Sequence, residues 1–121
     1  MKITNNTESL KRTRDFTRAY RRGKFAAGGF VGVHAIKNPF KNTKNRAGFV
    51  AGKSVGNAVT RNRVKRILRE AYRFCAPQLP LGYDFVFVAR SRASAKTAEQ
   101  LTRDIRFALA KLGFKIQKPK K

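Results

Sequence analysis

The chain has 121 residues and carries 29 lysines and arginines against 6 acidic residues, a formal net charge of +23 at pH 7. In a globule this small the positive charges repel one another. The excess therefore indicates a polyanionic partner such as a nucleic acid. A hydrophobic fraction of 41% and an aromatic fraction of 11% exclude a disordered basic tail. We therefore interpret residues 1–121 as one binding domain, with an ordered core over 9–113 and flexible ends at 1–8 and 115–121.

The cysteine content and the lengths of the apolar runs indicate in which cellular compartment the protein works. Cys75 is the only cysteine, which excludes a disulfide within the chain and fits a reducing environment. The apolar runs are strand-sized, and the first residues lack the apolar region of a signal peptide. The sequence thus predicts a cytoplasmic protein with no membrane partner.

The first predicted helix covers residues 13–22. Thr13 is a candidate cap, and Asp15 lies in the first turn, where the helix dipole favours an anion. Phe16, Ala19 and Tyr20 follow the helical spacing i, i+3, i+4 and form one apolar patch.

A β-rich stretch follows. Residues 30–36 and 47–51 read as strands joined by a polar loop, and we expect them to pair as a hairpin. The segment 25–27 gives a weaker strand signal. Later in the chain, residues 83–89 alternate aromatic and aliphatic side chains, with Phe85 and Phe87 on one face of the strand.

Two further helices complete the pattern. One covers about residues 57–74, and the other begins near Ser94 or Thr97 and ends at Gly113. The second has the capping-box spacing of Thr97 and Gln100. The order helix–strands–helix–strand–helix predicts an α+β fold, a single small sandwich with one helical layer against one sheet.

The helix over 57–74 has one apolar face and one basic face. At 100° per residue, Arg61, Lys65, Arg66 and Arg69 fall within one arc, with Tyr72 as the only aromatic residue among them. A solvated amphipathic face is the ordinary alternative. Solvated faces usually mix signs, however, whereas Glu70 is the only acid here, and cations in the first turns oppose the helix dipole. Both features favour polyanion binding.

The residues entering this helix carry a specific motif. It reads Gly56-Asn57-Ala58-Val59-x-Arg61-Asn62-Arg63-x-Lys65-Arg66-x-x-Arg69-Glu70, preceded by Lys53-Ser54-Val55. This motif closely resembles the signature of the bacterial ribonuclease P protein component. The likeness extends to the Phe16 and Tyr20 region and to the strand 83–90, covering roughly residues 10–112.

The resemblance implies a function and a set of site residues. In that family the RNA subunit performs a magnesium-dependent cleavage that removes the 5′ leader of precursor tRNA, and the protein contacts both RNAs. The implied cofactor is Mg²⁺ held with the RNA subunit, with no metal on the protein alone, no catalytic residue in the protein and no required protein partner. The fold would contain a left-handed strand-helix-strand crossover. The implied RNA-binding residues are Lys53, Asn57, Arg61, Asn62, Arg63, Lys65, Arg66, Arg69 and Arg73, and the implied leader-binding cleft contains Phe16, Tyr20, Phe85 and Phe87.

The remaining chemistry agrees with this division of labour. The six acids are scattered, whereas a metal-dependent nuclease needs them clustered. His34 is the only histidine, and we interpret it as a satisfied strand residue; Cys75 reads as a small core residue. Glu70 has two alternative roles: it pairs with neighbouring arginines, or it helps to bind a magnesium ion shared with RNA. For the aromatic residues, core packing is the alternative to a cleft.

Two other functions stay open at this point. The first is a non-catalytic RNA-binding protein such as a ribosomal component, from which the motif over 56–70 distinguishes this chain. The second is an architectural DNA-binding protein, although no helix-turn-helix or zinc site is recognisable.

Overall fold

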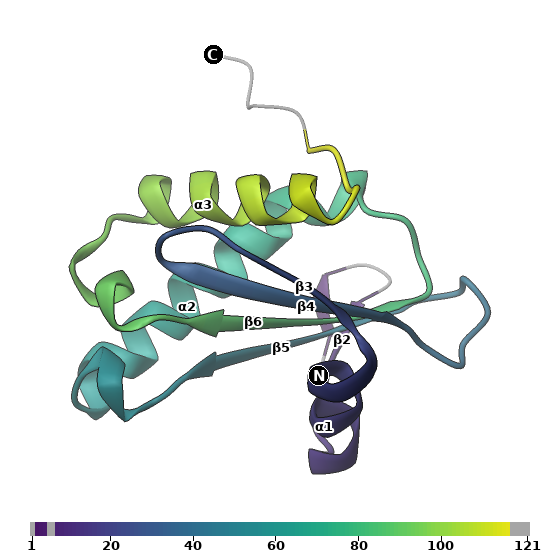
Figure 1. Cartoon of the computed structure of the whole chain (residues 1–121), viewed down its shortest axis with the longest axis horizontal. Coiled ribbons are helices and arrows are strands. Elements are labelled where there is room, and N and C mark those ends of the chain that lie inside the picture. Colours follow the sequence, from purple (N-terminus) through teal and green to yellow (C-terminus); the bar gives the residue numbers. More distant parts are fainter. Residues whose placement is uncertain (1, 5–6, 117–121) are drawn as a thin grey trace.

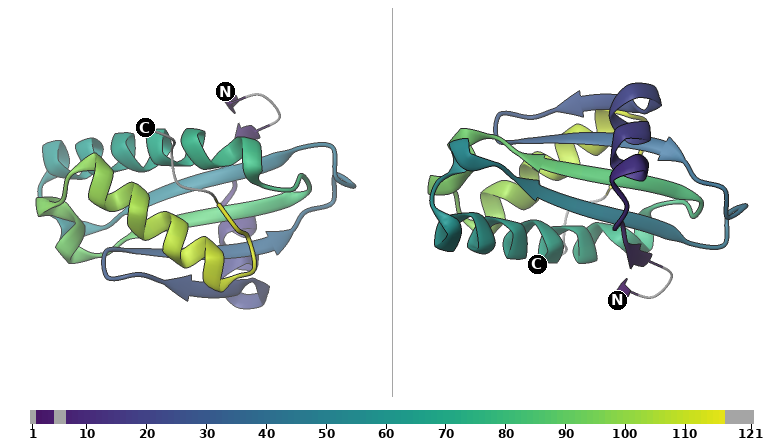
Figure 2. Two further views of the ribbon diagram at one scale, coloured as in Figure 1. Left: turned by 90° about the horizontal axis from the view of Figure 1, so that it is seen from above. Right: turned by 90° about the horizontal axis from the view of Figure 1, so that it is seen from below.

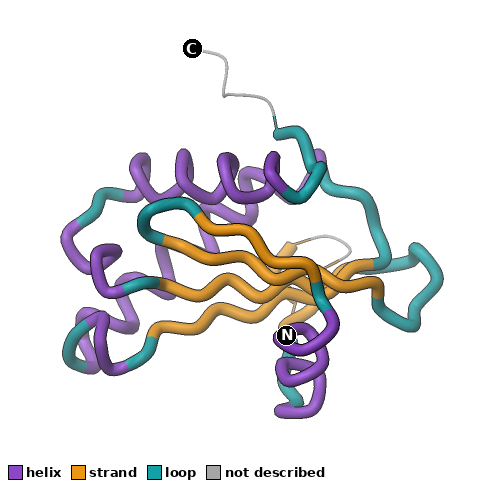
Figure 3. Tube along the Cα trace, in the orientation of Figure 1, coloured by secondary structure: helices purple, strands orange, loops and turns teal. Residues whose placement is uncertain are grey.

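The computed structural model describes residues 2–4 and 7–116. The described chain forms one six-stranded sheet and three α-helices (Figures 1 and 3). In chain order the elements are β1 (Lys2–Thr4), β2 (Thr7–Ser9), α1 (Thr13–Arg22), β3 (Lys24–Ala27), β4 (Val31–Lys37), β5 (Asn45–Ala51), η1 (Lys53–Val55), α2 (Ala58–Cys75), η2 (Ala76–Gln78), β6 (Tyr83–Ala89), η3 (Ser91–Ala95) and α3 (Ala98–Lys111), where η denotes a 3₁₀ turn.

The α+β class and the element order from α1 onward are those predicted from the sequence. Strand β1 and the first two residues of β2 fall within residues 1–8, where we expected a flexible end, and β2 pairs with β5 in parallel. Of the C-terminal end predicted to be flexible, residues 117–121 lie outside the described residues.

The sheet order is β1-β2-β5-β6-β4-β3, which corrects one prediction. We expected β4 and β5 to form a hairpin, but β6 lies between them, antiparallel to β4 and parallel to β5. Strand β6 is flanked on both sides, and its apolar run over residues 85–89 suits such a central position. The hairpin prediction was wrong because the hydrophobic pattern of a strand does not determine which strand pairs with it.

Helix α2 connects two parallel neighbours, β5 and β6. Seen from the helix side, with both strands pointing up, β6 lies to the left of β5, so the crossover is left-handed (Figure 2, left). This is the rare hand for such a connection and is the one that the family resemblance implies.

Helices cover both faces of the sheet, where we expected one helical layer. Helices α2 and α3 lie together on one face, and α1 crosses the other face alone (Figures 1 and 2). The main core lies under α2 and α3 and includes Val33, Leu68, Phe87 and Ile105, all fully buried. A smaller cluster under α1 has three buried residues, Leu10, Ala19 and Val86.

Local signals explain the helix boundaries. The Asn57 side chain accepts a hydrogen bond of 2.9 Å from the Thr60 amide and caps α2. The predicted capping box of α3 is present in both directions between Thr97 and Gln100. Helix α1 has the predicted bounds, but its N-cap is Arg12 with no side-chain cap bond, so the prediction that Thr13 caps it was wrong. Within the described residues, no helix combines the length and apolar character needed to cross a membrane.

Candidate nucleic-acid interface

Two exposed rings and one half-buried ring form an aromatic surface on the sheet face that carries α1. The His34 imidazole on β4 lies 4.8 Å from the Tyr20 ring and 4.6 Å from the Phe25 ring, measured between centroids. Tyr20 is 43% exposed and Phe25 is 57% exposed. We call Tyr20, Phe25 and His34 the aromatic platform. Large aromatic residues held side by side at a surface are suited to stacking against flat ligands.

Strand register and two glycines build this platform. Phe25 on β3 pairs directly with His34 on β4, so both side chains leave the same face of the sheet. A β-carbon on Gly32 would lie 2.8 Å from the Phe25 ring, and one on Gly48 would lie 2.5 Å from the ring of Phe16 on α1. The two glycines therefore let rings rest directly on the backbone of the sheet.

Two of the four aromatic residues assigned to a cleft are elsewhere. Phe85 and Phe87 are 0% exposed and lie on the opposite face of β6, in the main core beneath α2. Their rings contact Tyr72 on that helix. The prediction that they line an accessible cleft was wrong, because the face of β6 that points toward α1 carries Val86 and Val88 instead.

Sequence reasoning missed Phe25 and misread His34. We expected a satisfied strand histidine, but His34 Nδ1 is buried and has no hydrogen-bond partner among the described residues. Burial also lowers the pKa of His34 below its ordinary value of 6.5. The missed signal was the pairing of β3 with β4, which is not visible in the sequence of either strand alone.

His34 gives a direct test of the platform, since it is the only histidine in the chain. We expect an NMR titration of the free protein to give a midpoint below 6.5, because the surrounding rings disfavour the charged imidazolium. The unfolded chain then binds the proton more readily, so this residue lowers stability as the pH falls below about 6.5 and has no such effect well above it. A midpoint at or above 6.5 would contradict the burial of this imidazole.

The second surface is on α2. Asn62, Arg66 and Arg73 are exposed, and Arg61, Lys65 and Arg69 are half-buried. The Arg69 guanidinium lies 5.6 Å from the centre of the Phe49 ring. These six residues, which we call the basic strip, lie together along the helix as the wheel predicts. Lys53, on η1 just before α2, is also exposed.

Two of the predicted binding residues are hydrogen-bonded at the start of α2. Arg63 points toward η3, where it donates hydrogen bonds of 3.2 and 3.3 Å to the carbonyls of Ser94 and Lys96. The oxygen of the Asn57 side chain is occupied by the helix cap. Both residues therefore help to hold the start of α2, and neither is grouped with the basic strip.

Tyr72 is buried although helical spacing places it on the basic side of α2. It was the one aromatic residue on the basic side, yet it is fully buried, and its hydroxyl lies 2.9 Å from Thr7 Oγ1 on β2. Burial raises its pKa. The strands β1 and β2 extend the sheet beside α2 and cover this side, so the buried arc of the helix is wider than the apolar residues alone indicate.

The acidic side chains are mostly engaged with donors. Asp84 and Asp15 bind Arg46, Glu8 binds Lys44, and Asp104 accepts hydrogen bonds from three backbone amides of residues 29–31. Within the part of the chain that the structure describes, no three His, Cys, Asp or Glu side chains are grouped so that they could hold a metal ion. Cys75 is buried as expected, and burial raises its pKa to about 12.

Comparison with known proteins identifies one family. The family model described as Ribonuclease P matches residues 4–113. The ribonuclease P protein component of Clostridioides difficile is 37% identical over 103 residues, covering 84% of this chain and 89% of that protein. That of Natranaerobius thermophilus is 45% identical over 85 residues, covering 70% and 72%.

Solved structures agree with the sequence relatives. The 2.0 Å structure of the Staphylococcus aureus RNase P protein matches with a TM-score of 0.73 and 27% identity, covering 88% of this chain and 95% of that one. The RNase P protein from Thermotoga maritima matches with a TM-score of 0.72 and 27% identity, covering 92% and 99%.

Proposed function

This chain belongs to the ribonuclease P protein family, and on that premise we propose that it binds both the catalytic RNA of ribonuclease P and the single-stranded 5′ leader of precursor tRNA. The RNA subunit performs the magnesium-dependent cleavage, and the protein raises affinity for the precursor. The free, buried Cys75 fits a role in the reducing cytoplasm. Membership of this family removes the ribosomal and DNA-binding alternatives.

The observation that carries the leader assignment is the aromatic platform. A base of any identity has a flat face that can stack on an aromatic ring, and each such contact contributes about 1–3 kcal/mol without reading sequence. Leaders differ between tRNAs, so sequence-tolerant stacking is the mode of recognition that they require. The exposed rings of Tyr20 and Phe25 offer it on a chain whose charge of +23 attracts the backbone of the same strand.

We assign the basic strip to the catalytic RNA. Arg61 lies at the end of the first turn of α2, where the dipole of the helix N-terminus also attracts phosphate, and Lys65 lies one turn further on. The strip has like charges in consecutive turns, and Glu70 is the only acid on the helix. Phosphates relieve this repulsion, and Lys53 on η1 extends the same positive end of the molecule.

Arg66 tests this assignment through salt dependence. Arg66 is exposed on the basic strip, so Arg66→Ala is expected to weaken binding of ribonuclease P RNA. The plot of log K against log salt concentration should become less steep, by about one released counterion. Arg103→Ala is the matched control, because Arg103 is an exposed arginine on α3 that pairs with Glu99. Identical slopes for wild type and Arg66→Ala would remove Arg66 from the interface.

The carboxylates of this chain do not fit a magnesium site held by the protein alone. Those on Asp84, Asp15, Glu8 and Asp104 are engaged with internal donors, Glu99 pairs with Arg103, and Glu70 is exposed by itself on α2. We therefore assign the catalytic Mg²⁺ to the RNA subunit. Glu70 is the one carboxylate on the basic strip's helix that could contribute to an ion shared with RNA.

Reconstitution tests the function as a whole. At a magnesium concentration too low for the cognate ribonuclease P RNA to act alone, adding this protein is expected to restore removal of the 5′ leader. Polylysine at equal charge is the control for non-specific screening. If the folded protein gives no more cleavage than polylysine does, the proposal is wrong.

A further inference from the structure

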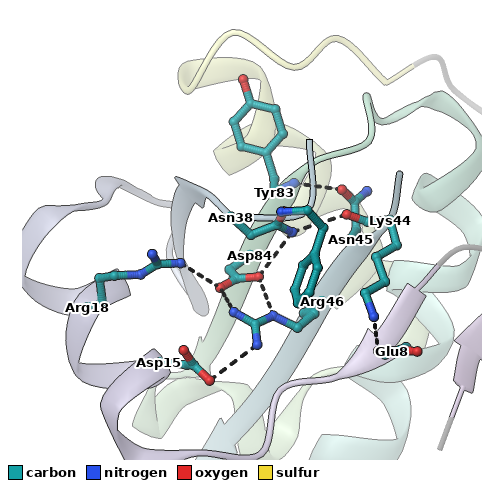
Figure 4. A network of polar contacts seen from close by, with 10 residues as sticks. Glu8, Asp15, Arg18, Asn38, Lys44, Asn45, Arg46, Tyr83 and Asp84 are labelled. Carbon is teal, nitrogen blue, oxygen red and sulfur yellow. Dashed lines mark hydrogen bonds and ion pairs between the residues drawn. The ribbon is translucent and has the colours of Figure 1, made fainter. Parts of the chain in front are cut away.

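Helix α1 is attached to the sheet by an ionic network around one buried carboxylate (Figure 4). Asp84 on β6 is 0% exposed and accepts two hydrogen bonds from Arg46 on β5, at 2.8 Å from Nε and 2.7 Å from Nη2. Arg18 on α1 reaches the same carboxylate at 3.3 Å, and Arg46 Nη1 lies 3.3 Å from Asp15 on α1. We call Asp15, Arg18, Arg46 and Asp84 the α1 clamp.

Helix α1 has a smaller apolar contact with the sheet than α2 and α3 have. The cluster beneath it has three buried residues, with Phe16, Ile36, Val50 and Val88 partly buried against them, whereas α2 and α3 share the main core. Its N-terminus has no side-chain cap. The helix also carries Arg14, Arg18, Arg21 and Arg22 within ten residues, so it repels a protein that is already strongly positive.

The clamp and the aromatic platform share this short helix. Asp15 precedes Phe16, and Arg18 lies two residues before Tyr20, so the two ion pairs hold the turns from which these rings project. Tyr20 lies on α1 and His34 lies on β4, so the contact between their rings depends on where α1 sits on the sheet. A tilt of α1 would therefore change the separation of rings on different elements.

We propose that the α1 clamp sets the spacing of the aromatic platform and so determines how strongly the protein distinguishes precursor tRNA from mature tRNA. Its members are positioning residues. They act on the leader by holding Tyr20 over His34, and not by touching RNA. This inference rests on the proposed leader-binding function.

Asp15→Ala separates positioning from simple charge. It makes the protein more positive, so electrostatics alone predicts tighter binding of any RNA. Loss of one of the two ion pairs that tie α1 to the sheet predicts the opposite for the leader. We expect the ratio of precursor to mature tRNA affinity, measured with the reconstituted holoenzyme, to fall by about three- to tenfold. Glu99→Ala is the matched control, since Glu99 is also an acid in the first turn of a helix and its pair with Arg103 is exposed. It should leave the ratio unchanged.

Hydrogen exchange gives a second measurement in the same variant. Amides of α1 should exchange faster in Asp15→Ala while those of α2 and α3 keep their wild-type protection. At Arg18, glutamine should lower the affinity ratio and lysine should restore most of it. An unchanged ratio in Asp15→Ala, or a fall of equal size in Glu99→Ala, overturns the inference. If the wild-type holoenzyme itself fails to prefer the precursor, the proposed leader binding fails instead.

Discussion

Asp84→Ala is expected to destabilise the folded protein by about 3–5 kcal/mol, the usual cost of removing one partner from a buried ion pair. The substitution leaves the Arg46 guanidinium, only 15% exposed, without the carboxylate that takes two of its hydrogen bonds. Arginine keeps its proton in proteins even without a carboxylate partner, so this guanidinium cannot escape the penalty by becoming neutral. Urea unfolding followed by circular dichroism measures the loss.

Glu8→Ala is the control for that measurement. Glu8 also forms an ion pair, with Lys44 at 2.8 Å, but its side chain is 44% exposed. Exposed pairs contribute little, so the control should cost far less stability than Asp84→Ala. Equal losses for the two variants would mean that the burial of Asp84 has no energetic consequence.

Tyr20→Ala is expected to have the largest effect on leader binding. Its ring is 43% exposed and contacts His34, so the substitution removes a stacking surface at small cost in stability. We expect precursor tRNA to bind more weakly by about 1–3 kcal/mol, roughly 5- to 150-fold, while mature tRNA is unaffected. Binding of both RNAs to the holoenzyme at fixed salt measures the difference.

A matched control and a neighbouring variant make this result specific. Phe107 on α3 is 55% exposed, so Phe107→Ala removes a comparable exposed ring away from the platform and should change neither affinity. Phe16→Ala should also weaken precursor binding more than mature tRNA binding. Its ring rests on Gly48, however, so part of its effect will be on stability. Equal losses of both RNAs in Tyr20→Ala would exclude a leader contact.

Local interactions explain why the helices could be predicted. The Asn57 cap and the Thr97–Gln100 capping box act within three residues, and the sequence contains all of their partners. The basic strip likewise follows from helical spacing alone. These features required no knowledge of which strands are neighbours.

Non-local pairing explains what could not be predicted. Alternation along β6 correctly separated Phe85 and Phe87 from Val86 and Val88, but both faces are apolar and both are covered by helices, so the pattern could not say which face is the main core. The insertion of β6 between β4 and β5 has the same origin. His34 became a candidate site residue only when its pairing with Phe25 was known.

Site-specific crosslinking tests most directly whether the leader lies on the aromatic platform. Cys75 is buried with a pKa raised to about 12, so a cysteine introduced at the surface is the reactive thiol for attaching a photocrosslinker. The two positions to compare are Phe25→Cys on the platform and Phe107→Cys on α3, where the native side chains are 57% and 55% exposed. In a holoenzyme bound to precursor tRNA, we predict crosslinks to the leader from position 25 and not from position 107. Leader crosslinks of equal yield from both positions, or from position 107 alone, would contradict the placement of the leader on the aromatic platform.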